Sequence, residues 1–130
     1  MKNRDIYISA LKLIGENEDV EINEDYAERA PYLLAAFCSD CSETEAAYRE
    51  YKKIEASDDT DPVRLPLESE FPFVEKFSVA AAFYLAAMLI IDENAALSDK
   101  IYDRYCDLMA RIQSEIPSRI EKIADRYGAY

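Results

Sequence analysis

The sequence contains no histidine and only two glycines, Gly15 and Gly128. Histidine is the commonest general base and metal ligand in proteins, so every histidine-dependent catalytic triad is excluded. Phosphate-binding loops, dinucleotide fingerprints and nucleophile elbows each need several glycines at fixed spacing, which two isolated glycines do not supply. The best-marked classes of enzyme are therefore absent, and we predict a protein that is not an enzyme, with no catalytic residues, no metal site and no cofactor.

Positive charge is also scarce. The chain has 15 lysines and arginines against 27 aspartates and glutamates, a net charge of -12. Proteins bind nucleic acid mainly through lysine and arginine contacts to phosphates, so we expect no direct nucleic-acid binding. The negative net charge is complementary to that of a basic protein partner, although acidic residues on solvated helix faces explain the same composition.

Long apolar runs are missing. The longest, residues 77–91, is shorter than the ~20 residues needed to cross a bilayer, and charged residues close it at both ends. The N-terminal residues include the charged Lys2, Arg4 and Asp5 and contain no apolar stretch typical of a secretory signal. We therefore predict a cytoplasmic protein with no membrane span.

With few glycines and five prolines the chain favours helices over tight hairpins. The spacing of apolar residues predicts helices at 6–14, 26–41, 42–54, 101–112 and 120–127, and residues 77–91 are apolar on every face, as in a central core helix. A long acidic, proline-containing loop is expected near residues 56–72. The prediction is a single all-α domain spanning 1–130, a compact bundle of about five or six helices.

Two helix boundaries depend on local signals. Pro31 either kinks a helix that begins near Glu24 or marks the first turn of a helix that begins at the proline itself. Ser42 followed by Glu45 has the spacing of a capping box, which predicts that a separate short helix starts there.

Cys38 and Cys41 have the two-residue spacing of redox pairs and of half a zinc site. Cys106 could add a third zinc ligand, but a structural zinc site usually closes with a fourth cysteine or a histidine. Reactive thiolates need positive neighbours, whereas Asp40 and Glu43 are acidic. We interpret the three cysteines as ordinary thiols in a reducing compartment.

Acidic clusters allow a calcium interpretation, but the stretches that begin at Asn17 and Asp59 lack the glycine on which an EF-hand loop turns. Pairs of carboxylates on helices have the chemistry for acid/base work, yet nothing in the sequence places two of them in contrasting environments. Solvated loops and helix faces explain these residues more simply.

The chain is rich in tyrosine, with ten. Tyrosine is favoured at protein interfaces, but its ring also lines seams between helices with the hydroxyl reaching water. Both interpretations remain open, and the interface interpretation selects these residues: Tyr48, Tyr51, Phe71, Phe73, Tyr127 and Tyr130.

Much of the chain resembles small helical tailed-phage and prophage proteins encoded beside head-tail connector genes. The resemblance is specific only in the combination of its elements: Leu65 and Pro66 in a short turn, an alanine-rich apolar helix that ends in the run from Leu89 to Glu93, a helix that carries Tyr102 and Tyr105, and an N-terminal stretch with Tyr26, Arg29 and Pro31. It implies a structural role by self-assembly or by docking on portal-type and other virion proteins. No catalytic residues carry over, and the strand-rich arm of ring-forming connectors is missing.

These observations give one leading hypothesis and two alternatives. The leading hypothesis is a non-enzymatic virion structural protein of the head-tail connector type. The first alternative is an acidic cytosolic protein that binds a basic partner, which would present a continuous acidic face. The second is an enzyme that depends on carboxylates or thiols, which would gather such groups with shifted pKa values in one pocket.

Overall fold

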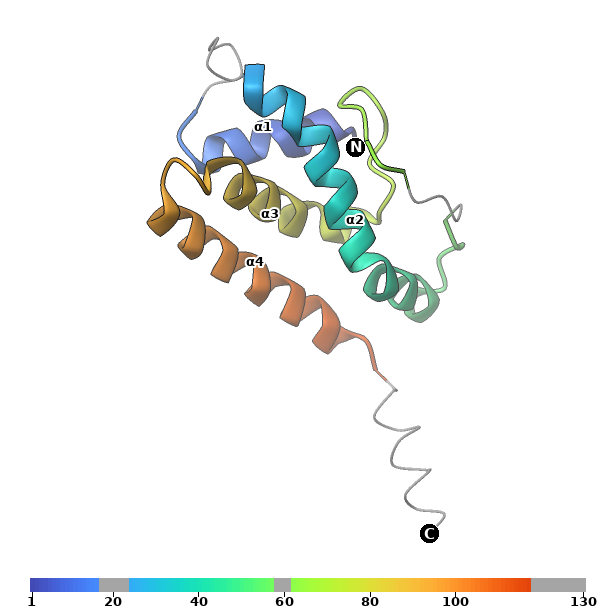
Figure 1. Cartoon of the computed structure of the whole chain (residues 1–130). Helices are drawn as coiled ribbons and strands as arrows, with labels where there is room; N and C mark the ends of the chain where they lie inside the picture. The colour runs from blue at the N-terminus through green and yellow to red at the C-terminus, as the bar shows by residue number, and fades with distance from the viewer. Residues whose placement is uncertain (17–23, 58–61, 118–130) are drawn as a thin grey trace.

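The computed structural model describes residues 1–16, 24–57 and 62–117. These residues form four α-helices: α1 (Asn3–Leu13), α2 (Glu24–Lys52), α3 (Ser78–Ile90) and α4 (Ala95–Glu115). A 3-10 helix, η2 (Glu75–Phe77), leads into α3, and no strand occurs in the described ranges (Figure 1). The all-α class is confirmed, while the four helices of the described ranges do not match the predicted count of five or six.

α1 ends at Leu13, one residue before the predicted end at residue 14, and Gly15 follows two residues later. This glycine has a φ of +77°, a left-handed conformation that glycine adopts readily because it has no Cβ. Its N–H donates to the carbonyl of Lys12 over 3.2 Å, and the N–H of Glu16 donates to that of Leu11 over 2.8 Å. The pair of hydrogen bonds is a Schellman motif, which satisfies carbonyls left free by the end of the helix.

α2 begins at Glu24 and continues past Pro31, so the helix starts before the proline rather than at it. Ser42 and Glu45 lie within the same continuous helix, and the separate helix predicted at 42–54 is therefore wrong. Ser42 Oγ donates to the carbonyl of Ser39 over 3.1 Å instead of capping a new helix. Hydrogen bonds of this kind bend helices, and Figure 1 shows the last turns of α2 running in a different direction from its first turns.

The remaining helix of the original count, predicted at 120–127, lies outside the described residues. The predicted core helix at 77–91 corresponds to α3, and the amphipathic helix predicted at 101–112 is the middle of the longer α4. Asn94 precedes α4, and its Oδ1 accepts a hydrogen bond from the N–H of Leu97 over 3.1 Å. This side chain is a normal N-terminal cap.

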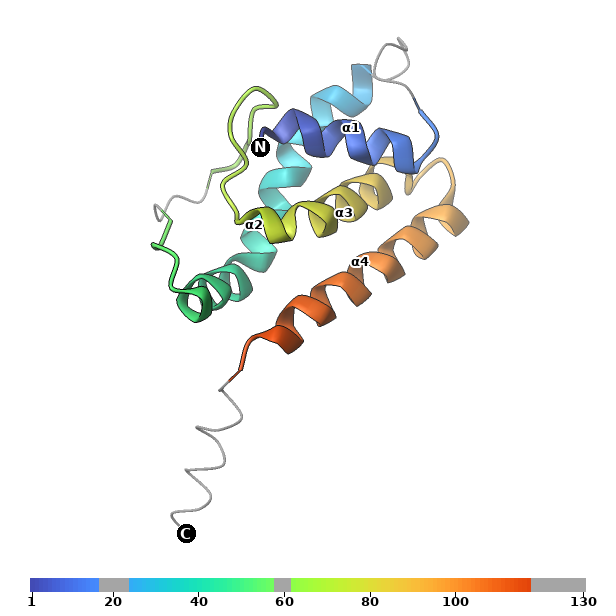
Figure 2. The ribbon, with the colours of Figure 1, turned by 180° about the vertical axis from the view of Figure 1, so that it is seen from behind.

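α3 is the centre of the fold. It contacts α1, α2 and α4, and α4 packs against it in the antiparallel direction (Figure 1). Seen from behind in Figure 2, α1, α3 and α4 lie side by side in one layer and α2 crosses behind them. The alanines of α3 are buried and allow this close packing of neighbours.

The loop of residues 62–74 is fixed to the start of α1. The backbone N–H groups of Asn3 and Arg4, which have no partner within the helix, donate to the carbonyls of Ser69 and Leu67 over 2.9 Å each. Leu65, Leu67 and Phe71 from this loop are buried in the core. Part of the long loop predicted at 56–72 is therefore a packed element of the fold.

Candidate functional site

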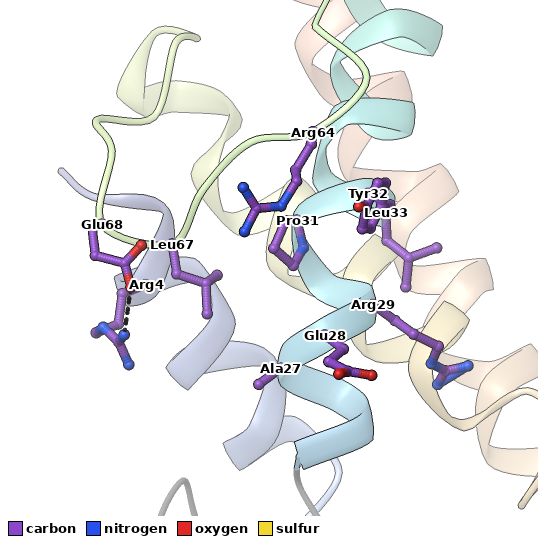
Figure 3. Close-up of a pocket in the computed structure, with 10 residues that line it drawn as sticks. All are labelled: Arg4, Ala27, Glu28, Arg29, Pro31, Tyr32, Leu33, Arg64, Leu67 and Glu68. Carbon is purple, nitrogen blue, oxygen red and sulfur yellow. Dashed lines mark hydrogen bonds and ion pairs between the residues drawn. The ribbon is translucent and has the colours of Figure 1, made fainter.

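An open hollow of 910 Å³ lies between the start of α1, the first half of α2 and the 62–74 loop (Figure 3). Leu67 and Pro31 provide apolar surface, and Tyr32 is a large side chain at its edge with 53% of its surface exposed. Among the described residues that line it there is no serine, threonine, cysteine or lysine. The lining of the hollow therefore combines apolar surface with charged side chains.

Three arginines line this hollow, but they do not converge. Arg4 pairs with Glu68 over 3.1 Å, and the Arg64 side chain extends between Pro31 and Leu67 (Figure 3). Arg29 points to the other side of α2, where it donates to the carbonyl of Leu89 over 2.7 Å. The hollow consequently has mixed charge and does not form a positive cradle for an anion.

Arg29 instead joins α2 to the end of α3. Its Nε lies 3.3 Å from Asp25, within ion-pair distance but without hydrogen-bond geometry. One turn earlier, the Tyr26 hydroxyl donates to the carboxylate of Glu93 in the turn between α3 and α4. Burial and this hydrogen bond raise the pKa of Tyr26, so its hydroxyl stays protonated and anchors the turn.

A second hollow, of 850 Å³, lies between the second half of α2 and the chain that follows it. An ion pair lines this hollow: Arg49 Nε donates to Glu45 Oε2 over 2.7 Å, and Glu45 is 2% exposed. Glu45 Oε2 also accepts from the N–H of Val74 over 2.9 Å, and Arg49 donates to the carbonyl of Pro72 over 3.1 Å. The pair thus ties α2 to the 62–74 loop, and each of its charges is used in a structural contact.

The cysteines separate into two environments. Cys38 and Cys41 are buried on α2, and Cys106 is exposed on α4. Cys41 Sγ lies 3.4 Å from the Tyr105 hydroxyl, and burial raises the pKa values of both groups. Within the described ranges no three cysteine, aspartate or glutamate side chains come together in a way that could hold a metal ion.

The residues selected as an interface occupy different positions. Tyr48 and Phe71 are buried, Phe73 is half-buried, and Tyr51 is exposed at the end of α2. Tyr127 and Tyr130 lie outside the described residues. The four that are described belong to one chain of ring contacts, which passes from Tyr51 and Tyr48 through Phe77 to Phe73 and Phe71.

The same ring contacts continue across the core. Phe37 of α2 lies 5.9 Å from Phe73, 5.7 Å from Tyr84 and 6.1 Å from Tyr105, measured between ring centroids. Tyr105 in turn lies 5.3 Å from Tyr102, on the surface of α4. The described aromatic side chains of the interface prediction therefore act largely as a core cluster that holds α2, α3 and α4 together, with Tyr51 at one exposed end.

Sequence reasoning missed an apolar surface on α3. Val79 is 54% exposed and Phe83 is half-buried, although every neighbouring position toward the middle of the helix is buried. The two residues are four apart and so lie on one side of the helix. α3 contacts α1, α2 and α4, and Figure 2 shows α3 from a side on which no helix lies in front of it. We call the surface formed by Val79 and Phe83 the open face of α3.

A signal for this surface was present in the sequence. A helix that is apolar on every face needs neighbours all round it, and residues 77–91 had this composition. The sequence left open whether the chain itself or another subunit covers this helix. The structure shows that the described part of the chain covers it incompletely.

No helix among the described residues is long and apolar enough to cross a membrane. The chain matches no family model, and comparisons with curated proteins and with solved structures found no match.

Proposed function

We propose that the chain is a non-enzymatic structural protein of a tailed-phage virion, of the head-tail connector type. It works by docking on neighbouring virion proteins, including copies of itself, through the open face of α3. The observation that carries this proposal is the 54% exposure of Val79 on α3, the most apolar of the four described helices.

The energetic reason is the cost of leaving apolar surface in water. Burying a valine or phenylalanine side chain completely contributes about 1.5–3 kcal/mol relative to leaving it exposed. Val79 and Phe83 lie side by side, so one docking event removes both from water, and adjacent apolar side chains mark contact sites more reliably than scattered ones. The remainder of α3 is rigidly packed, which lowers the entropy cost of presenting them.

The location of this surface also agrees with the resemblance to head-tail connector proteins. The alanine-rich helix and the helix with Tyr102 and Tyr105 were two of its elements, and they are α3 and α4. The open face therefore belongs to the part of the chain that carries the resemblance. In the second hollow, the Glu45–Arg49 pair ties α2 to the 62–74 loop, which is a structural use of its two charges.

Light scattering across protein concentration and salt tests the proposal. We expect the mass to rise with concentration and not to fall as salt is added, because salt does not weaken apolar contacts but does screen the repulsion between two acidic copies. Val79→Asp should abolish this rise. Val63→Asp is the matched control, since Val63 is 81% exposed and lies in the 62–74 loop, away from α3, and this variant should assemble like the parent.

Assembly that is equal in Val79→Asp and in the parent would contradict the role of α3. A parent chain that remains monomeric at every concentration would remove self-assembly from the proposal. Docking on a portal-type protein would then be measured by co-sedimentation with the same two variants, and loss of binding in both or in neither would refute it.

A further inference from the structure

We infer that α4 exchanges between two copies of the chain, so that the α4 of each copy packs on the α3 of the other. In this exchanged dimer the turn of residues 91–94 is helical, and α3 and α4 form one long helix. The inference goes beyond the proposed function, because the surface that it uses is the contact between α3 and α4 and not the open face.

The buried side of α3 is in phase with the buried side of α4. Residues seven apart lie on nearly the same side of a helix. One such series crosses the turn, and Ile91, its member in the turn, is 48% exposed. The other members of this series are each at most 8% exposed: Phe77, Tyr84, Ser98, Tyr105 and Ile112. A continuous helix would therefore place Ile91 in line with buried residues of both helices.

The backbone of the turn is close to that of a helix. Ile91 has φ -55° and ψ -37°, and the N–H of Asn94 donates to the carbonyl of Ile90 over 2.9 Å, which is the spacing of an α-helix. At Asn94 the backbone leaves the helical conformation, with φ -150° and ψ 81°. A rearrangement within one turn of chain thus converts the hairpin of α3 and α4 in Figure 1 into one helix.

α4 depends mainly on α3 for its packing, and no other described helix gives it a comparable neighbour. Ser98 Oγ donates to the carbonyl of Ala87 over 2.9 Å, and Lys76 Nζ pairs with Glu115 Oε1 over 2.9 Å at the other end of the two helices. The same contacts form when α4 comes from another copy, because exchanged elements are identical. The partner that fits this surface is therefore a second copy of the chain.

The exchanged dimer also gains a contact that the closed chain lacks. The paired positions of α3 and α4 are centred on residues 92–96, so two straight helices in this register have their two-fold axis there. Ile91 lies within about one turn of that axis and is buried against the other copy. In the closed chain, the hydrogen bond from Tyr26 to Glu93 holds the turn. The closed chain is therefore favoured at low concentration and the exchanged dimer at high concentration.

A cross-link between positions 76 and 115 tests the inference. Lys76→Cys and Glu115→Cys are combined with Cys106→Ser, which removes the exposed native thiol of the described residues. The chain is refolded from urea at low or high concentration, diluted, and treated with a short bismaleimide. A closed chain is linked within one copy and runs as a monomer on a denaturing gel, even if it had docked through the open face. An exchanged dimer is linked between copies, and we expect this covalent dimer after refolding at high concentration.

Two further changes act on the turn, each with a matched control. Ile91→Asp should lower the share of covalent dimer at least about tenfold, because it places two carboxylates near the axis instead of two apolar side chains. Val63→Asp, also at an exposed valine or isoleucine position, should leave that share unchanged. Asn94→Ala removes the cap of α4 and favours a helical turn, so it should raise the share severalfold. Gln113→Ala, at an exposed position of α4, should not raise it.

Absence of the covalent dimer in Asn94→Ala after refolding at high concentration would overturn the inference, as would a covalent dimer that Ile91→Asp does not reduce. Circular dichroism of each variant confirms that it is folded. The proposed function fails by a different result, the absence of any effect of Val79→Asp on assembly of chains that were folded at low concentration. Such chains remain closed during light scattering because exchange requires α4 to leave the core, and Val79→Asp should leave the covalent dimer unchanged.

Discussion

The Glu45–Arg49 pair should stabilise the fold far more than the Asp25–Arg29 pair, although both join an acidic residue to an arginine four residues later in α2. Exposed pairs at this spacing contribute about 0.3–0.5 kcal/mol, and the Asp25 side chain is 68% exposed. The Glu45 side chain is 3% exposed and the Arg49 side chain 15%. Removing one partner of a fully buried pair costs about 3–5 kcal/mol, because a charge is left without compensation.

The free energy of unfolding that is lost in Glu45→Gln should be somewhat smaller than that range. Arg49 keeps backbone carbonyl acceptors on Glu55 and Pro72, and the glutamine oxygen remains available to the N–H of Val74. What is lost is the charge-assisted part of these contacts, so we expect the free energy of unfolding to fall by about 1.5–3 kcal/mol.

Urea denaturation followed by far-ultraviolet circular dichroism measures this difference. With a slope of about 2 kcal/mol/M, the midpoint of Glu45→Gln should fall by about 1 M. Asp25→Asn is the control and should lower the free energy of unfolding by no more than about 0.5 kcal/mol. A Glu45→Gln midpoint equal to that of the parent, or equal losses in the two variants, would refute the reasoning from burial.

Three further predictions concern the helix end, the thiols and the buried tyrosines. Lys53 ends α2 with a φ of +58°, so Lys53→Gly should raise the free energy of unfolding by about 0.5–1 kcal/mol in urea titrations, and a decrease would contradict this. Ellman's reagent should modify Cys106 rapidly in the native chain and Cys38 and Cys41 only after unfolding; rapid reaction of all three would show that the core is open. Burial raises the pKa of Tyr105 above its ordinary value of 10.0, so the stability that this shift provides is complete below pH 10 and is lost as the pH rises further. When the free energy of unfolding is measured from pH 9 to 11.5, its decrease with pH should therefore be less steep in Tyr105→Phe than in the parent. An unchanged slope would refute the assignment.

Much of the helical architecture was predictable, because it depends on local pattern. Gly15 ended α1, the apolar run at 77–91 became α3, and the spacing around Ile101 and Ile112 located α4. Such patterns report which residues share a side of a helix, which is set by the geometry of the helix alone.

The capping box misled because its residues have partners far away in the sequence. Glu45 is bound to Val74, which is 29 residues away, and to Arg49, so it does not reach back to start a new helix. Ser42 Oγ donates to the carbonyl of Ser39, and α2 continues past both residues. A local motif has no information about a competing tertiary contact, and here that contact determined the helix boundary.

The candidate surfaces were harder to predict for a related reason. Tyr48, Phe71 and Phe73 are aromatic residues of the kind that is favoured at interfaces. The 62–74 loop brings Phe71 and Phe73 into the core cluster around Phe37, and Tyr48 contacts the same cluster through Phe77. Exposure of Val79 depends on how far α1 and α4 extend over α3, which is a property of the packed helices and not of the sequence near Val79. Patterns therefore predicted the helices better than the surfaces between them.

The attachment of the 62–74 loop to α1 has a consequence for synthesis on the ribosome. Asn3 Nδ2 donates to the carbonyl of Pro66 over 2.8 Å, a contact that spans 63 positions of the sequence. The start of α1 therefore obtains these partners only after residues 66–69 have been translated, and closing so large a loop is slow compared with forming a helix. Of the four described helices, α1 leaves the ribosome before the others, but its start waits for the 62–74 loop before it is secured in the native fold.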